Sequence, residues 1–191
     1  MTDVKCSVRG SKPLPDILEQ GLKVLFVGFN PGLRSAEKGH HYAGPSNRFW
    51  QFLFTAGLTP EKLDYSRDWQ LPEYGYGSTN IVDRPSRAAS EITREEYLAG
   101  RESLRELLDT YRPLVACYVG AGVYKAFVGR ERQDWGRQPN QIVNGVIDFV
   151  APSPSGLNRI PLAQQIEVYK TLKELIQELA PKDGFDRERP V

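Results

Sequence analysis

The sequence predicts an α/β fold, a three-layer α/β/α arrangement around a central, mostly parallel sheet of about four or five strands. Short apolar runs rich in β-branched and aromatic residues alternate along the chain with segments whose apolar residues recur at helical spacing. Strands that are apolar on both faces are typical of a parallel sheet covered by helices on each side. Ligands of such sheets bind beyond the carboxyl ends of the strands, so functional residues are expected in the loops that follow them.

Four apolar runs are predicted to be strands. They cover residues 23–29, residues 77–83 ("GSTNIVD"), residues 113–120 ("PLVACYVG") and residues 147–151. The second run ends before Pro85, which cannot donate a backbone hydrogen bond to a neighbouring strand.

Three helices are predicted, over residues 47–58, 97–111 and 162–180. Ser46 is placed to cap the first, whose aromatic residues Phe49, Trp50, Phe52 and Phe54 are expected in the core. Thr93 and Glu96 have the spacing of a capping box before the second helix. The third helix stops before Pro181.

The length and the charge of the chain limit the class of protein to which it can belong. The 191 residues are 40% hydrophobic, which predicts one globular domain over residues 14–180 with polar tails at 1–13 and 181–191. The net charge of +1 gives no global basic field, so a nucleic-acid partner would have to be held by a local basic patch.

The two cysteines, Cys6 and Cys117, are too few and too far apart for a disulfide framework or a four-cysteine iron–sulfur cluster. A reducing, intracellular compartment is therefore expected, the cytoplasm and nucleoid of a bacterium or the nucleus of a eukaryote. No apolar run suits a signal peptide or a membrane span, so no membrane partner is expected.

The loop after the first strand, "GFNPG", places a polar Asn30 between two glycines. Gly28 and Gly32 let the backbone turn sharply and approach a ligand. Pro31 biases Asn30 toward an extended conformation, in which its amide can orient a water or a base edge. The alternative is a turn in which Asn30 bonds only its own backbone.

The following segment holds the only two histidines, His40 and His41. Adjacent histidines are poorly spaced for a metal site on any regular element, so no histidine-rich metal site is expected. A Ser-His-Asp triad stays open by count, although no G-x-S-x-G motif accompanies it.

Two ordered motifs resemble those of the mismatch-specific uracil-DNA glycosylase and thymine-DNA glycosylase family. The first is "GFNPGLRSAEKGHHYAGPSNRFW", and the second is "PSPSGLNR". The intervening "YGYGSTNIVDRPS" and "YRPLVACYVGAGVYKAF" resemble family segments in the same order. The resemblance spans residue 23 to the final helix. It implies a monomeric enzyme without a cofactor that flips uracil opposite guanine out of DNA and hydrolyses its N-glycosidic bond.

The resemblance also assigns roles to single residues. Asn30 matches the catalytic asparagine that positions the attacking water. Tyr42 matches the aromatic residue that stacks on the flipped pyrimidine, and Asn80 a polar residue that binds the base edge. The remaining expected pocket residues are Gly28, Phe29, Pro31, Gly32, Ser35 and Ser153.

The second motif implies a loop that fills the space left by the flipped base. Leu157 would be the wedge, and the loop backbone would face the widowed guanine. The loop residues are Ser155, Gly156, Leu157, Asn158 and Arg159. Arg34, Lys38, Arg48 and Arg159 are candidates for phosphate contacts. Leu157 as a core anchor and Arg159 as a surface ion-pair partner are the alternatives.

Asp83 is a second catalytic candidate, because it ends the predicted second strand and asparagine cannot accept the proton that water must lose. The alternative is that Asp83 bonds turn amides or pairs with Arg84.

Ser35 and Ser153 combine features of the uracil-excising and thymine-excising branches, so the range between uracil, thymine and other damaged pyrimidines stays open. We expect the pocket to prefer uracil, because Ser35 and Tyr42 should crowd a 5-methyl group. Two other functions stay open: a non-catalytic binder of damaged DNA, and a nucleotide-dependent enzyme that uses the loop 120–125 for phosphate.

Overall fold

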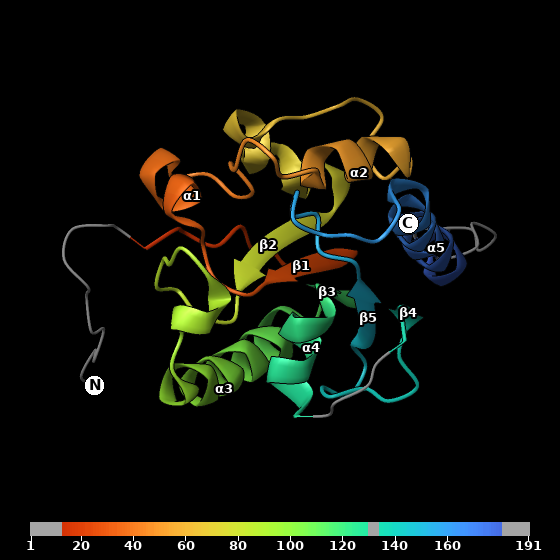
Figure 1. The fold of residues 1–191 in the computed structure, drawn as a ribbon. Coiled ribbons are helices and arrows are strands. Elements are labelled where there is room, and N and C mark those ends of the chain that lie inside the picture. The colour runs from red at the N-terminus through yellow and green to blue at the C-terminus, as the bar shows by residue number, and fades with distance from the viewer. Residues whose placement is uncertain (1–12, 130–133, 181–191) are drawn as a thin grey trace, which may run out of the picture.

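The computed structural model describes residues 13–129 and 134–180 and has a five-stranded sheet in the order β2-β1-β3-β5-β4 (Figure 1). The strands are β1 (Val24–Gly28), β2 (Tyr76–Asn80), β3 (Val115–Val119), β4 (Gly136–Arg137) and β5 (Ile147–Ala151). The first three pairings are parallel and the last is antiparallel. This mostly parallel sheet confirms the predicted fold class.

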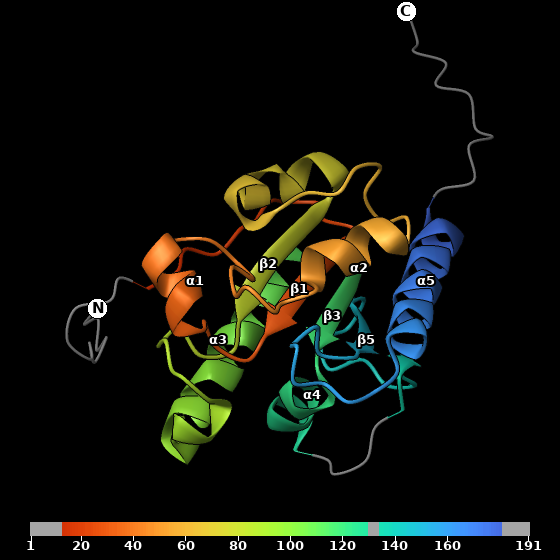
Figure 2. The ribbon, with the colours of Figure 1, turned by 45° about the horizontal axis from the view of Figure 1, so that its top comes forward.

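Two layers of helices cover the sheet. The strand β1 alternates between them, since Phe26 contributes to one apolar cluster and Leu25 to the other. The first cluster includes α2 (Phe49–Thr55), the 3-10 helix η1 (Tyr65–Tyr74) and α5 (Leu162–Leu179). The second includes α3 (Arg94–Tyr111) and α4 (Ala121–Val128). Figures 1 and 2 show α2 and α5 on one side of the sheet and α3 and α4 on the other.

Helix α3 begins as predicted with a complete capping box. Thr93 Oγ1 accepts from the Glu96 backbone N–H at 3.2 Å, and the Glu96 carboxylate accepts from the Thr93 N–H at 2.8 Å. The prediction for α2 was wrong at its start, because Asn47, not Ser46, accepts a hydrogen bond from the N–H of Phe49, at 2.9 Å. Its aromatic residues are buried as expected except Phe54, which is 44% exposed.

Several helical segments were not among the predicted ones. They are α1 (Leu33–Lys38), η1, the 3-10 turn η2 (Ala89–Glu91) and α4. Each is short or of 3-10 type, so none carries enough apolar repeats to be recognised from periodicity. Helix α1 matters most for the site, because it follows the Asn30 loop directly.

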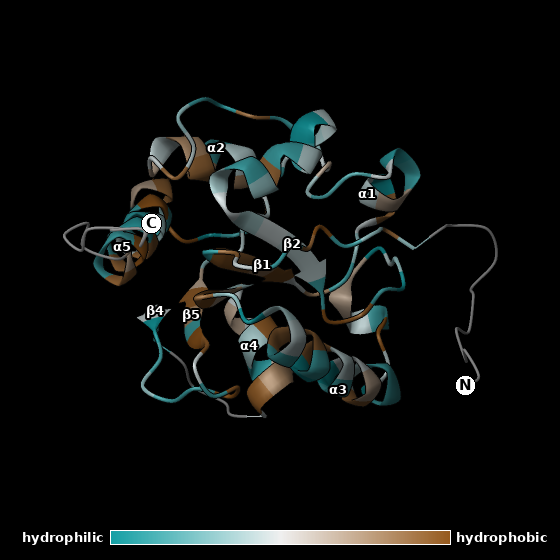
Figure 3. Ribbon diagram, turned by 180° about the vertical axis from the view of Figure 1, so that it is seen from behind, coloured by the Kyte–Doolittle hydropathy of each residue, from teal (hydrophilic) through white to brown (hydrophobic). Residues whose placement is uncertain are grey.

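The prediction placed the end of the second strand too late. Strand β2 ends at Asn80, and the Ile81 and Val82 N–H groups instead donate to the carbonyls of Gly28 and Phe29, both at 3.0 Å. The weakly apolar composition of β2, visible as a pale ribbon beside the brown β1 in Figure 3, blurred this boundary. Gly28 and Asn80 pair in register, so both strands deliver polar loops to one edge.

The segment before β1 covers the open edge of β2. Ile17 and Ser78 exchange two backbone hydrogen bonds of 2.9 and 3.0 Å in an antiparallel bridge. Gly77 is required there, because a Cβ would lie 2.5 Å from the Ile17 carbonyl oxygen. The predicted tails, apart from Pro13, and Cys6 lie outside the described residues, whereas Cys117 is a buried free thiol in β3.

Candidate functional site

A cavity of about 240 Å³ opens at the carboxyl ends of the parallel strands. It is lined by Leu14, Gly28, Phe29, Asn30, Pro31, Gly32, Arg34, Ser35, His41, Tyr42, Gly44, Asn47, Asn80, Val119, Ser153 and Pro154. The structure therefore brings together every residue predicted for the base pocket. The position agrees with the rule that ligands of open α/β sheets bind outside the carboxyl ends of the strands.

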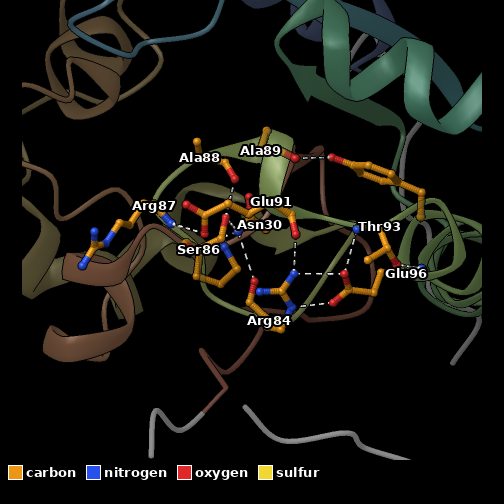
Figure 4. A network of polar contacts seen from close by, with 11 residues as sticks. Asn30, Arg84, Ser86, Arg87, Ala88, Ala89, Glu91, Thr93 and Glu96 are labelled. Carbon is orange, nitrogen blue, oxygen red and sulfur yellow. Dashed lines mark hydrogen bonds and ion pairs between the residues drawn. The ribbon is translucent and has the colours of Figure 1, made fainter. Parts of the chain in front are cut away.

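Asn30 is anchored by its amide nitrogen (Figure 4). The Nδ2 group donates to the Ser86 hydroxyl at 2.8 Å, the Arg84 carbonyl at 3.1 Å and the Pro31 carbonyl at 3.3 Å. No described residue donates a hydrogen bond to its Oδ1, which remains available as an acceptor in the wall of the cavity. Because its main partners lie more than 50 positions away, Asn30 does more than close a local turn.

The segment that holds Asn30 is itself fixed to helix α3. The Arg84 guanidinium forms an ion pair with Glu96, the capping-box residue, at 2.5 Å and donates to the Glu91 carbonyl at 2.8 Å (Figure 4). The hydrogen bonds from Arg84 are the main cause that lowers the pKa of Glu96 to about 2. The helix cap therefore stays charged across the physiological range and ties the loop after β2 to a rigid element.

Gly28 and Asn80 form the floor of the cavity between β1 and β2. A Cβ on Gly28 would lie 2.5 Å from Asn80 Oδ1, so the glycine makes room for that amide. A Cβ on Gly122 in α4 would lie 3.5 Å from the Phe29 ring, an ordinary van der Waals distance, so close packing does not require a glycine there.

Tyr42 forms an aromatic wall of the cavity. Its ring stacks on Phe49 with centroids 3.7 Å apart and an interplanar angle of 15°. Its backbone is left-handed, with φ of 53°, a conformation that bulky residues rarely adopt and that signals a strongly constrained position. The Tyr42 hydroxyl is buried and makes no hydrogen bond of regular geometry among the described residues. Burial raises the pKa of this phenol above its usual value, and the nearby Ser78 hydroxyl offsets part of that effect.

Buried polar groups fix the segment that carries Tyr42. His41 Nε2 lies 3.0 Å from the Pro15 carbonyl, which can only accept, so the neutral imidazole takes a hydrogen bond from Ser78 at Nδ1, 2.9 Å away. Burial lowers the pKa of His41 and favours this neutral form. The carboxylate of Asp68 accepts from the His41 backbone N–H at 2.7 Å and contacts the His40 ring at 2.8 Å.

These contacts do not form a Ser-His-Asp catalytic triad. The serine bonded to His41 is Ser78, which is wholly buried in β2, and Asp68 contacts the other histidine ring. The arrangement holds the pocket wall in place and presents no exposed nucleophile. Ser35 has a similar supporting contact, since its Oγ accepts from the Ala43 N–H at 3.1 Å.

The loop Ser153–Arg159 lies beside the cavity and presents Leu157 to solvent. Leu157 is 90% exposed, so the alternative that it anchors the core is wrong. Hydrogen bonds within the loop hold its shape: Asn158 Nδ2 donates to the Ser153 carbonyl at 2.8 Å, and the Asn158 N–H to the Ser155 carbonyl at 3.0 Å. An apolar side chain on a structured, exposed turn has the form of a wedge.

The contacts of Arg48 differ from the phosphate contact that was predicted for it. Instead of standing free for phosphate, its guanidinium donates to the carbonyls of Ser155 at 2.8 Å and Asn158 at 3.5 Å. It also lies over the Phe52 ring, 5.8 Å from the centroid. The other predicted phosphate ligands, Arg34, Lys38 and Arg159, are exposed, and Arg34 also lines the cavity.

Asp83 is exposed and does not line the cavity. Because β2 ends at Asn80, Asp83 lies beyond the strand end on which its predicted catalytic position depended. The proposed pairing with Arg84 was also wrong, since Arg84 pairs with Glu96. The geometry gives Asp83 no direct contact with the site.

Sequence reasoning missed several residues that build the site. Leu14, His41, Asn47, Val119 and Pro154 line the cavity, and Ser86 anchors Asn30 from outside it. Among the described residues there is no group of three or more His, Cys, Asp or Glu side chains placed to hold a metal ion. No helix within residues 13–129 and 134–180 has the length and apolarity of a membrane span.

The fold is a mostly parallel sheet whose carboxyl ends border a cavity with Asn30 in its wall and an exposed loop with Leu157 beside it. The family model of the uracil DNA glycosylase superfamily matches residues 15–180, and the chain belongs to that superfamily. The fold is similar to the solution NMR structure of a candidate uracil DNA glycosylase from Methanosarcina acetivorans. The match has a TM-score of 0.53 and 19% identity and covers 85% of this chain and 98% of that one.

Proposed function

We propose that this protein is a monofunctional DNA glycosylase that excises uracil opposite guanine from double-stranded DNA and leaves an abasic site. The observation that carries the proposal is the anchoring of Asn30. Three acceptors hold its Nδ2 group, so its Oδ1 is the end that faces a substrate water.

The proposed chemistry follows from a neutral positioning residue. Asn30 Oδ1 accepts a hydrogen bond from water and directs its oxygen toward the sugar carbon as the base leaves. The sugar then resembles an oxocarbenium ion and the base carries negative charge. Once the water oxygen has bonded to the sugar carbon, the proton that the water loses passes through solvent to the base anion, which leaves as the neutral base. Backbone N–H groups on the glycine-containing loop are suited to stabilise such an anion, and the enclosed site strengthens their effect.

The size of the cavity supports a single-ring base. Its volume of about 240 Å³ lies below the roughly 300–1,000 Å³ of pockets for drug-sized ligands, which suits a small ligand such as a pyrimidine base. Asn80 supplies an amide for the base edge, and the Tyr42 ring, backed by Phe49, supplies an apolar wall. Leu157 fills the gap in the duplex.

We propose uracil rather than thymine as the preferred base, because Ser35 and Tyr42 both line the cavity and are expected to crowd a 5-methyl group. Discrimination by one methyl group is worth about 1–3 kcal/mol, so thymine should react slowly rather than not at all.

The test is a single-turnover incubation of the protein with duplexes that carry G·U, A·U, G·T or G·C pairs, followed by hot alkali. A monofunctional uracil glycosylase gives alkali-dependent strand scission at G·U, slower scission at G·T and none at G·C. Scission without alkali would contradict the monofunctional assignment. Binding of G·U without scission would make the protein a damage-binding module. The absence of both binding and scission would refute the proposal.

A further inference from the structure

Arg48 joins the start of helix α2 to the loop that carries Leu157. Its Nη2 group donates to the Ser155 carbonyl at 2.8 Å and lies 3.5 Å from the Asn158 carbonyl, so one guanidinium spans the turn that contains Leu157. The Arg48 backbone N–H adds a hydrogen bond of 2.9 Å to the Pro154 carbonyl.

The backbones of the two segments are also in direct contact. A Cβ on Gly156 would lie 2.7 Å from the Ser46 Cβ and 3.0 Å from the Ser46 carbonyl oxygen. Residues 46–48 are thus joined to the Ser153–Arg159 loop in three ways: by the hydrogen bonds of the Arg48 side chain, by the backbone hydrogen bond of Arg48, and by the close contact between Ser46 and Gly156. Asn47 within this segment and the earlier Tyr42 both line the cavity, so the same part of the chain borders both the pocket and the loop.

The hydrogen-bond acceptors of the Arg48 guanidinium are backbone carbonyl groups. No ion pair joins it to any described carboxylate, and its Nε is buried without a hydrogen-bond partner within the described residues. Hydrogen bonds from a charged donor are shorter and stronger than those between neutral groups, so carbonyl acceptors suffice to fix the turn. The Phe52 ring beneath the guanidinium adds a cation–π contact.

Leu157 needs such support, because at 90% exposure its own packing does not hold it. An unsupported apolar side chain on a loop would fold back onto the protein surface, and ordering it again would reduce the free energy of binding.

We propose that Arg48 is a positioning residue that keeps the Leu157 turn in its outward conformation and thereby couples entry of the wedge into DNA to capture of the base in the cavity. This inference rests on the proposed function and adds a residue to it. Arg48 acts through Leu157 and contacts neither the base nor the phosphate.

The first test compares Arg48→Met and Arg48→Lys with the wild type. The readout is the ratio of affinities for a duplex with a tetrahydrofuran abasic-site analogue opposite guanine and for a matched G·C duplex. We expect the ratio to fall at least about tenfold in both variants, while affinity for the G·C duplex changes less than about threefold. Arg67→Met, which removes an arginine paired with Glu61 away from the loop, should leave the ratio unchanged.

A double-mutant cycle shows whether Arg48 acts through the wedge. In a Leu157→Ala background, Arg48→Met should change the ratio by less than about twofold. Independent, multiplying effects would overturn the proposal. Recovery of both affinities by Arg48→Lys would overturn it too, because a charge alone would then suffice, as for a phosphate contact.

Hydrogen exchange in the free protein separates this inference from the proposed function. The N–H groups of Leu157 and Asn158 should exchange at least about tenfold faster in Arg48→Met, with no change in Arg67→Met. Unchanged exchange would overturn the positioning role even if uracil excision is confirmed. Failure of the wild type to excise uracil, with exchange altered as expected, would refute only the glycosylase assignment and the coupling built on it.

A second variant covers the case in which Arg48→Met does not fold. Gly156→Ala leaves Arg48 intact but forces the loop away from Ser46, and it should give the same fall in the affinity ratio. A Gly156→Ala protein with wild-type ratio and wild-type exchange would overturn the proposal.

Discussion

Asn30 Nδ2 donates to the Ser86 hydroxyl oxygen across 2.8 Å, although 56 positions separate the two residues along the chain. The Ser86 hydroxyl in turn donates to the Ala88 carbonyl at 2.7 Å. Its single proton is therefore used, and its oxygen faces Asn30 as an acceptor. This pair sets which end of the Asn30 amide points toward Ser86 and which end remains for water.

The first prediction compares Asn30→Ala with Ser86→Ala. Asn30→Ala removes the acceptor for water and should slow single-turnover excision of uracil from a G·U duplex at least about tenfold, about 1.4 kcal/mol. Ser86→Ala leaves the Asn30 Oδ1 acceptor in place but removes one hydrogen bond that holds the Asn30 amide. Because one hydrogen bond is worth about 0.5–1.5 kcal/mol, we expect the single-turnover rate to fall about two- to tenfold.

Both variants should bind the abasic-site duplex like the wild type, and Ser86→Thr, which keeps a hydroxyl, should restore the rate. An Asn30→Ala protein with nearly full activity would show that another group orients the water.

The second prediction concerns Asp83, which is exposed and outside the cavity lining. Asp83→Asn should change the single-turnover rate by less than about threefold, because a surface carboxylate away from the site stabilises neither the sugar cation nor the attacking water. Rates of Asp83→Asn and Asn30→Ala are measured side by side across pH. A severe loss in Asp83→Asn, with normal folding and DNA binding, would return Asp83 to the mechanism.

The third prediction concerns the buried hydroxyl of Tyr42, which makes no hydrogen bond of regular geometry among the described residues. Tyr42→Phe keeps the ring that stacks on Phe49 and removes this buried polar group, so the free energy of unfolding should rise by about 1 kcal/mol in urea denaturation. Excision should stay within about threefold of the wild type, whereas Tyr42→Ala should lose both stability and activity. If Tyr42→Phe excised uracil tenfold more slowly, the hydroxyl would be a substrate ligand.

The fourth prediction is a pH dependence that arises at His41. Burial lowers its folded-state pKa below 6.5, so the unfolded chain takes up the proton first as the pH falls. The stabilising contribution of neutral His41 is complete above the unfolded-state pKa of about 6.5 and is lost as the pH falls toward the lower folded-state pKa. Urea denaturation of the wild type and His41→Gln at pH 7.5 and pH 5 measures this effect. A constant difference between the two proteins would contradict it.

The parts of the fold that depend on local sequence were predictable. The β5 strand has the predicted bounds, and Thr93 and Glu96 form the expected capping box, because apolar runs and caps are encoded by neighbouring residues. The position of the Asn30 loop at the cavity was predictable, because the loop follows the carboxyl end of a parallel strand.

The remaining errors have a common cause in long-range contacts. Arg48 was expected to contact a DNA phosphate, but its guanidinium binds backbone carbonyls more than 100 positions away in the sequence. Asp83 was expected in the site because the strand end was misplaced, and Ser86 was missed because only the folded chain brings it to Asn30. A residue type predicts which interactions a side chain can make, whereas its partner is chosen by the topology.

The antiparallel bridge between Ile17 and Ser78 has a consequence for self-association. Strand β2 is the outer strand of the sheet and would otherwise offer unpaired backbone groups to a strand of another molecule. The segment that covers this edge also places Leu14 in the cavity and Pro15 on His41. Detachment of residues 14–17 would therefore promote intermolecular strand pairing and dismantle one wall of the cavity at the same time, so loss of solubility and loss of base binding should occur together.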